Sequence, residues 1–238
     1  MIPKIIHYCW FGRNPLPPLA IKCIESWKKI LPEYEIKEWN EDNFDLDMYP
    51  YAREAYDNRK FAFVTDIVRL HALYTEGGVY MDTDVEILKP LDPYLHHSAF
   101  SGFEAEDRFS TGLMAAEKGS KWAKDNLEWY NDKHFVKDDG TLDTTTNVVI
   151  IMKVLEKYHF KLDNTYQEVS GYFTIYPKEY FCPKDYDTKK IHLTDNTVAI
   201  HHFDGSWHSK SDKIKELLCR ILGTKLYFSL LKIRNLEK

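Results

Sequence analysis

Apolar and polar residues alternate in blocks along the first forty positions, and the blocks have the lengths of two strands and a helix. Residues 4–11 form a short apolar run that ends at Gly12, as expected for a buried strand followed by a loop. Apolar residues then recur at helical spacing from Pro18 to Pro32, and residues 34–39 predict a second strand. This order of elements is typical of an α/β sheet, whose ligands bind outside the carboxyl ends of the strands.

A second helical pattern runs from Thr65 to Gly77. Thr65 is a residue type that caps helices, and glycine commonly follows their last turn, so we expect Asp66 in the first turn of this helix. Asp66 and Arg69 are three residues apart and share a helix face. An exposed ion pair contributes only about 0 to 1 kcal/mol, so this pairing alone does not separate a structural role from a functional one.

Apolar and polar residues alternate strictly in residues 79–87, within the stretch GGVYMDTDVEIL. The alternation predicts one strand that projects Asp82 and Asp84 to the same side. Aspartate is depleted in strands, and neighbouring carboxylates repel each other. A hard divalent cation such as Mg²⁺ or Mn²⁺ would relieve that repulsion, whereas a solvated strand face is the alternative explanation of an isolated D-x-D.

The remaining pattern is weaker and ends in a basic tail. It predicts strands near residues 99–103, 112–116 and 197–202, and helices near residues 121–134 and 146–157. We expect one α/β domain over residues 1–209 and an amphipathic helical segment over residues 210–238. Eight basic residues against three acidic ones in this segment suit contact with an anionic membrane surface, although packing on the domain would also bury its apolar stripe.

Composition and charge exclude several classes of protein. A net charge of −5 argues against general binding of nucleic acid, which favours a basic surface. The four cysteines form no C-x-x-C pair, so neither a zinc knuckle nor a disulfide framework is expected. No signal-like N-terminus and no apolar run of about 18 residues is present, so we expect a cytoplasmic location, with the tail allowing peripheral contact with the inner face of the cell membrane.

The late stretch HHFDGSW contains further groups that can bind a metal ion or phosphate. His201 and His202 can present imidazole to a metal ion, and the turn around Gly205 can present backbone N–H groups to phosphate. Adjacent strand residues face opposite ways, so we expect only one of the two histidines to join a site formed by the aspartates.

The block TDIVRLHALYTEGGVYMDTDVEILKP resembles the signature of the glycosyltransferase family with a DXD sugar-binding region. That family includes yeast initiating mannosyltransferases, bacterial capsule glycosyltransferases and, more distantly, the clostridial glucosylating toxins. The resemblance is specific over residues 62–90 and weaker in the opening IPKIIHYCWFG and the late AIHHFDGSW. It implies a GT-A fold with a Rossmann-like mixed sheet flanked by helices, a nucleotide-sugar donor, Mn²⁺ or Mg²⁺ as cofactor, and retention of anomeric configuration.

The resemblance also implies roles for individual residues. The implied metal ligands are Asp82, Asp84 and His202, with His201 as the alternative, and the implied catalytic residues are Asp82, Asp84 and Arg69. The implied contacts to the nucleotide sugar are Trp10, Asp66, Arg69, Tyr80, Asp82, Ser206 and Trp207. Trp10 could equally be a core residue. Asn147 is a possible polar contact at a helix start, but a role as helix cap is the favoured explanation.

The resemblance implies transfer of a hexose to a glycan or lipid-linked acceptor in surface polysaccharide synthesis. We expect the donor to be a UDP-sugar. The metal would stabilise the departing diphosphate, and no carboxylate stands out as a nucleophile, so we expect a front-face substitution. Two alternative functions fit the same residues. One is a divalent-metal hydrolase that uses Asp82, Asp84 and His202, and the other is a carbohydrate-binding protein without turnover.

Overall fold

The computed structural model describes residues 1–205 of the chain. The chain divides into two compact units, and the first spans Met1–Asp204. Ser206, Trp207 and the predicted helical segment 210–238 lie outside the described residues. The proposed boundary at residue 209 therefore stays a prediction.

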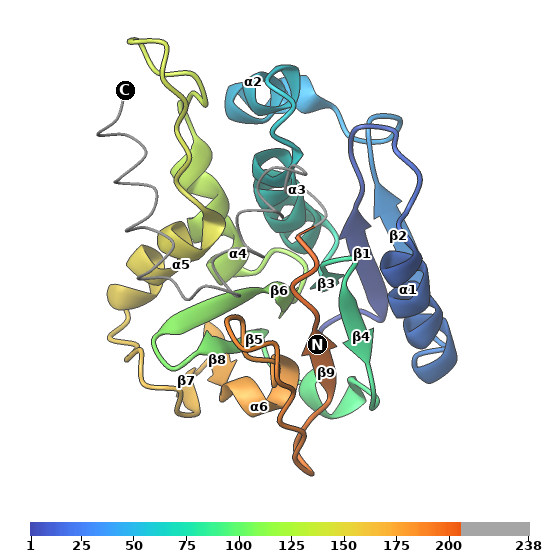
Figure 1. Ribbon diagram of the computed structural model, residues 1–238. Coiled ribbons are helices and arrows are strands. Elements are labelled where there is room, and N and C mark those ends of the chain that lie inside the picture. The colour runs from blue at the N-terminus through green and yellow to red at the C-terminus, as the bar shows by residue number, and fades with distance from the viewer. Residues whose placement is uncertain (206–238) are drawn as a thin grey trace, which may run out of the picture. The chain divides into compact units, whose positions relative to one another are not determined.

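A seven-stranded mixed sheet forms the framework (Figure 1). Strands β1 and β2 are parallel, as are β1 and β3, whereas β6 runs antiparallel to both β3 and β5. At the other side β8 is parallel to β5 and antiparallel to β7. The order across the sheet is β2 (Glu35–Trp39), β1 (Ile5–Cys9), β3 (Gly78–Met81), β6 (Arg108–Ala116), β5 (Ala99–Ala105), β8 (Phe173–Tyr176) and β7 (Gln167–Val169).

The prediction of one continuous strand over residues 79–87 is wrong. The chain leaves the large sheet after Met81 and enters a separate two-stranded sheet, in which β4 (Val85–Ile87) pairs antiparallel with β9 (Ala199–His201). Period-2 alternation continues across the gap, so the pattern alone did not reveal the break. The two aspartates therefore lie in the connection between the two sheets.

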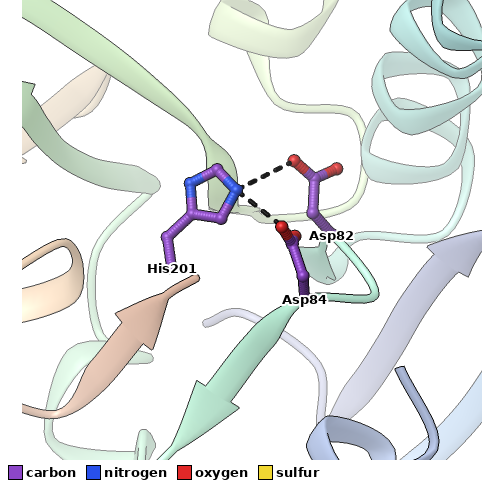
Figure 2. Close-up of side chains that lie close together, drawn as sticks. All are labelled: Asp82, Asp84 and His201. Carbon is purple, nitrogen blue, oxygen red and sulfur yellow. Dashed lines mark ion pairs between the residues drawn. The ribbon is translucent and has the colours of Figure 1, made fainter. Parts of the chain in front are cut away.

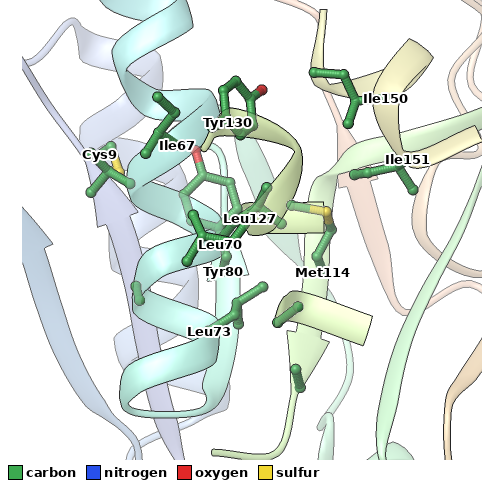
Figure 3. Close-up of a cluster of buried hydrophobic side chains, with 14 of the residues drawn as sticks. Cys9, Ile67, Leu70, Leu73, Tyr80, Met114, Leu127, Tyr130, Ile150 and Ile151 are labelled. Carbon is green, nitrogen blue, oxygen red and sulfur yellow. The ribbon is translucent and has the colours of Figure 1, made fainter. Parts of the chain in front are cut away.

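Side chains of alternate strand residues pack into two hydrophobic clusters. Tyr80 and Met114 point into the cluster formed with α3 and its neighbouring helices (Figure 3), whereas Val79 and Leu113 point into the cluster that includes α1. Helices on different faces give the mixed sheet flanked by helices that the resemblance implies. The helices are α1 (Pro18–Ile30), α2 (Pro50–Asp57), α3 (Phe61–Thr75), α4 (Lys121–Leu127), α5 (Asn147–Glu156) and α6 (Lys178–Phe181).

The helix predicted from Thr65 begins four residues earlier, at Phe61, and Lys60 is its N-cap residue. Asp66 consequently lies beyond the first turn and is buried rather than placed at an exposed helix end. The helix predicted over residues 121–134 is also shorter, because α4 ends at Leu127 and continues only as a 3₁₀ turn over Glu128–Tyr130. Helices α2 and α6 and strands β7 and β8 were not predicted.

Two adjacent glycines turn the chain from α3 into β3. Gly77 and Gly78 have φ angles of 72° and 111°, which side-chain-bearing residues rarely adopt. A Cβ at Gly78 would lie 2.5 Å from the carbonyl oxygen of Ile5, and one at Gly77 would lie 2.5 Å from the backbone nitrogen of Lys118. The double glycine thus lets β3 approach its neighbours closely and fixes where Asp82 emerges.

Candidate metal centre

Asp82 and Asp84 are held in a tight turn between the two sheets. The backbone N–H of Asp82 donates to the Gly112 carbonyl at 2.8 Å, which ties the turn to β6, and the N–H of Val85 donates to the Asp82 carbonyl at 3.0 Å. Both side chains are anchored by one oxygen each. Tyr80 donates its hydroxyl to Asp82 Oδ1 at 2.6 Å, and the N–H of Asp204 donates to Asp84 Oδ2 at 2.8 Å.

The free oxygens of both aspartates face the His201 imidazole (Figure 2). His201 Nε2 lies 3.8 Å from Asp82 Oδ2 and 3.3 Å from Asp84 Oδ1. One potential ligand atom from each of the three residues lies within 4.8 Å of the others. Two carboxylates and one imidazole around a common point suit a divalent cation such as Mn²⁺ or Mg²⁺, so the donor set fits the implied cofactor.

The structure brings His201, and not His202, to the two aspartates, which corrects our choice of His202 as a metal ligand. The side chains of these adjacent residues point apart, as expected at a strand end. His202 Nε2 instead lies 2.8 Å from Glu86 Oε2, the same oxygen that accepts from the Lys22 ammonium at 3.0 Å. The resemblance that implied His202 carries no information on which side of the strand each ring lies.

The charges of this cluster depend on one another. Burial alone would raise the pKa of Asp84, but the neighbouring His201 and backbone N–H donors outweigh it and lower the pKa to about 2. Burial disfavours a charged imidazolium, yet the Asp84 carboxylate raises the pKa of His201 well above its usual value. A proton on His201 therefore partly balances the aspartates, and a metal ion would have to displace it.

Arg69 connects this centre to Asp66. Its guanidinium is 3.4 Å from Asp66 Oδ1 and 3.5 Å from Asp82 Oδ1, which confirms the predicted pairing within the helix and extends it to the first aspartate of the motif. Nη1 also donates to the Thr111 carbonyl at 3.0 Å, and the guanidinium carbon lies 4.6 Å from the centre of the Tyr80 ring. The side chain of Arg69 is only 7% exposed, so it is held in one position.

Tyr80 and Trp10, which the resemblance implies contact the nucleotide, differ in their burial. Tyr80 is 1% exposed and points into the hydrophobic cluster of Figure 3, so its hydroxyl positions Asp82 while its ring is covered by protein. Trp10 is half-buried beside the other cluster and donates its indole N–H to the Asn14 carbonyl at 2.6 Å. Neither ring forms part of the metal centre itself, and their contacts to a nucleotide stay predictions.

Asp66 also joins α3 to the start of α5. Its Oδ2 accepts the backbone N–H of Asn147 at 3.1 Å, at a helix N-terminus where such donors lack partners within the helix. Asn147 is the first helical residue rather than the cap, which is Thr146, and its amide donates to the Tyr130 hydroxyl at 3.1 Å. Asn147 Oδ1 is buried and accepts no hydrogen bond among the described residues.

The stability of the metal-free protein is expected to depend on the ionisation of Asp66. Burial raises the pKa of Asp66 to about 6 from an ordinary value of 3.8, although Arg69 and the Asn147 N–H oppose the rise. Between these two pKa values the Asp66 carboxyl is protonated in the folded state and ionised in the unfolded state. The free energy of unfolding should fall by on the order of 2 to 3 kcal/mol as pH rises from about 4 to about 6.

Urea titrations of the wild type and of Asp66→Asn, both in EDTA, measure this effect. The amide can still accept the N–H at residue 147 but does not titrate, so its pH profile should be flatter than that of the wild type over the same interval. Parallel profiles for the two proteins would contradict the assignment.

Gly112 is a functional position that sequence reasoning missed. A Cβ at this residue would lie 2.7 Å from His201 Nδ1 and 2.8 Å from Cε1, so the imidazole ring rests directly against the backbone of β6. The sequence does not predict this contact, because β6 and β9 are far apart along the chain. The only available sign was a glycine inside a predicted strand, which often marks a close approach of another group.

A comparison with known families confirms the resemblance. Residues 17–101 match the family described as "Glycosyltransferase sugar-binding region containing DXD motif", a stretch that includes α1, α3 and the Asp82 to Asp84 turn. His201 lies outside the matched region.

Two of the relatives of known sequence are enzymes of fission yeast. The chain is 33% identical over 122 residues to inositol phosphoceramide mannosyltransferase 3 of Schizosaccharomyces pombe. This alignment covers 50% of this chain and 34% of the relative. It is 31% identical over 171 residues to inositol phosphoceramide mannosyltransferase 2 of the same organism. This second alignment covers 69% of this chain and 49% of the relative. The chain thus spans between a third and a half of the length of these relatives.

The fold is also found in a solved glycosyltransferase. The structure of the PaToxG glycosyltransferase superposes with a TM-score of 0.51 and 18% sequence identity, covering 66% of this chain and 70% of that chain. The predicted GT-A fold is therefore confirmed. Within residues 1–205, no helix has the length and apolar character needed to cross a bilayer.

Proposed function

We propose that this protein is a metal-dependent glycosyltransferase that moves a hexose from a nucleoside-diphosphate sugar to a glycan or lipid-linked acceptor. The observation that carries the proposal is the convergence of Asp82, Asp84 and His201 at the connection between the two sheets. It occurs on a GT-A fold and within a chain that matches the DXD sugar-binding region. The three residues would hold Mn²⁺ or Mg²⁺.

Each part of the centre has a distinct task in this reaction. When bound, the metal supplies Lewis-acid stabilisation of the negative charge that develops on the leaving diphosphate. Asp66 and Arg69 lie next to Asp82 and offer a carboxylate and a guanidinium that can hydrogen-bond hydroxyls of the donor sugar. Tyr80 fixes the Asp82 carboxylate, so that its second oxygen stays directed at the metal position.

The donor and acceptor are proposed at the level of chemical class. A UDP-sugar is our expectation for the donor, and the names of the fission yeast relatives add a mannosyl donor and a phosphoinositol-bearing lipid as acceptor chemistry. A lipid acceptor would suit contact between the basic tail and the inner face of a membrane. We further propose retention of anomeric configuration by a front-face substitution, since the centre offers residues that would hold a metal and an ion pair but no assigned nucleophile.

A donor screen tests the function. Purified protein with Mn²⁺ is incubated with a panel of UDP- and GDP-hexoses, with and without acceptors that include phosphoinositol lipids, and products are identified by mass spectrometry. We expect release of nucleoside diphosphate from one donor and, with a suitable acceptor, a product heavier by one hexose. Release of free sugar from every donor regardless of acceptor would indicate the hydrolase, and binding without any product would indicate a carbohydrate-binding protein.

A further inference from the structure

Lys184 is anchored next to the metal centre although it is distant from it in sequence. It follows α6 by three residues and forms the base of a hairpin, in which Lys184 bridges Ile191 and the N–H of Asp185 donates to the Lys190 carbonyl at 2.8 Å. The backbone of Lys184 is therefore held at the fixed end of the hairpin rather than at its tip. The side chain reaches from this base to the segment that follows β9.

The Lys184 ammonium lies on the segment that surrounds Asp84. Its Nζ donates to the His202 carbonyl at 2.6 Å. The N–H of His202 in turn donates to the Asp84 carbonyl at 3.0 Å, and the N–H of Asp204 donates to the Asp84 carboxylate. One backbone segment thus carries the His201 imidazole and, at the next residue, the carbonyl that holds the Lys184 ammonium.

No carboxylate of residues 1–205 forms an ion pair with Lys184, in contrast to the partly buried Lys37 and the buried Arg69. Lys37 pairs with Glu76, and Arg69 pairs with two aspartates. Burial lowers the pKa of Lys184, and so does the charge of Lys189, while the more distant Asp84 and Asp204 oppose this effect. Within residues 1–205 this partly desolvated ammonium donates only to a neutral carbonyl, which keeps its other donors available for an anion.

The charge balance of the centre calls for such a cation. The charge of a divalent metal held here would be cancelled by Asp82 and Asp84, and Arg69 is already engaged by Asp66 and Asp82. A bound diphosphate would then face a centre with little net positive charge. Negative charge on the diphosphate increases further as the sugar leaves, so a second cation beside the metal would stabilise both the bound donor and the product.

We propose that Lys184 binds the diphosphate of the nucleotide sugar alongside the metal ion. The proposal deepens the proposed function and rests on it. Lys184 would exchange part of its interaction with the His202 carbonyl for a charge-assisted bond to a phosphate oxygen, which is the stronger type of hydrogen bond. It would act on the diphosphate and not on the metal, because its ammonium cannot be a metal ligand.

Calorimetry with the full chain tests the proposal without measuring turnover. UDP, GDP, UMP and GMP are titrated in Mn²⁺ into the wild type, Lys184→Gln and Lys184→Arg, and Mn²⁺ alone is titrated in parallel. Lys190→Gln serves as the control, since Lys190 is an exposed cation on the same hairpin. We expect Lys184→Gln to weaken binding of the preferred nucleoside diphosphate by about 10- to 100-fold, with a much smaller effect on the monophosphate.

The remaining variants separate a role in binding from a role in folding. Affinity for Mn²⁺ alone should stay within about twofold of the wild type, Lys184→Arg should retain most of the diphosphate affinity, and Lys190→Gln should change neither. Equal loss of Mn²⁺ affinity in Lys184→Gln would assign Lys184 to holding the His202 carbonyl in place and would overturn the proposal. Unchanged diphosphate affinity would overturn it while leaving the proposed function intact, whereas a wild type that binds no nucleoside diphosphate would overturn both.

Discussion

Asp84→Asn is expected to lower the affinity for Mn²⁺ by more than about 100-fold and to abolish metal-dependent binding of the donor. The substitution keeps the shape of the side chain and an oxygen that can accept the N–H of Asp204, so the turn between the sheets should persist. It removes one of two negative charges at the position where the metal would lie. A neutral amide is a poorer ligand for a hard cation, and loss of even an outer-sphere partner typically costs 10- to 100-fold in affinity.

Isothermal calorimetry with Mn²⁺ measures this loss, and Asp107→Asn, in the exposed turn between β5 and β6, is the matched control. The histidines provide a second comparison at the same centre. His201→Asn should weaken Mn²⁺ binding, whereas His202→Asn should leave it nearly unchanged because His202 lies beside Glu86. Wild-type affinity in Asp84→Asn, or a larger effect at His202 than at His201, would be incompatible with the centre described above.

Local signals in the sequence were sufficient for the parts of the fold that depend on neighbours in the chain. The first strand, helix and strand were predicted within one or two residues, because apolar period and proline positions specify them locally. The glycine pair after α3 was equally informative, since both residues need positive φ angles. The Asp66 and Arg69 pair followed from helical spacing alone.

The predictions that failed concern features that depend on contacts between segments distant in the chain. The strand over residues 79–87 is divided because Val85 pairs with His201 rather than continuing along β6, and period-2 alternation is the same in both cases. The choice between His201 and His202 depends on which face of β9 meets the turn, which no spacing rule specifies. Gly112 and Lys184 were missed for the same reason, because each contacts a segment that is far away in the chain.

The second large effect is expected from Gly112→Ala, which places a methyl group where the His201 ring lies. Gly112 does not have a positive φ angle, so alanine is compatible with the backbone and the conflict is with the imidazole, 2.7 Å from the new Cβ. Overpacking of this kind typically costs about 1 to 3 kcal/mol of unfolding free energy. Because relief requires the ring to move away from Asp82 and Asp84, Mn²⁺ affinity should fall by about 10- to 100-fold.

A double-mutant cycle with His201→Ala isolates the cause. Removing the ring removes the atom that the new methyl group meets, so Gly112→Ala should cost clearly less in the His201→Ala background than in the wild type, as measured by urea denaturation in EDTA. Two residues in direct contact typically show an interaction energy of about 0.5 to 3 kcal/mol in such a cycle. Strictly additive costs would mean that the methyl group meets something other than His201. The backbone of β6 would then not be what holds the His201 ring against the two aspartates.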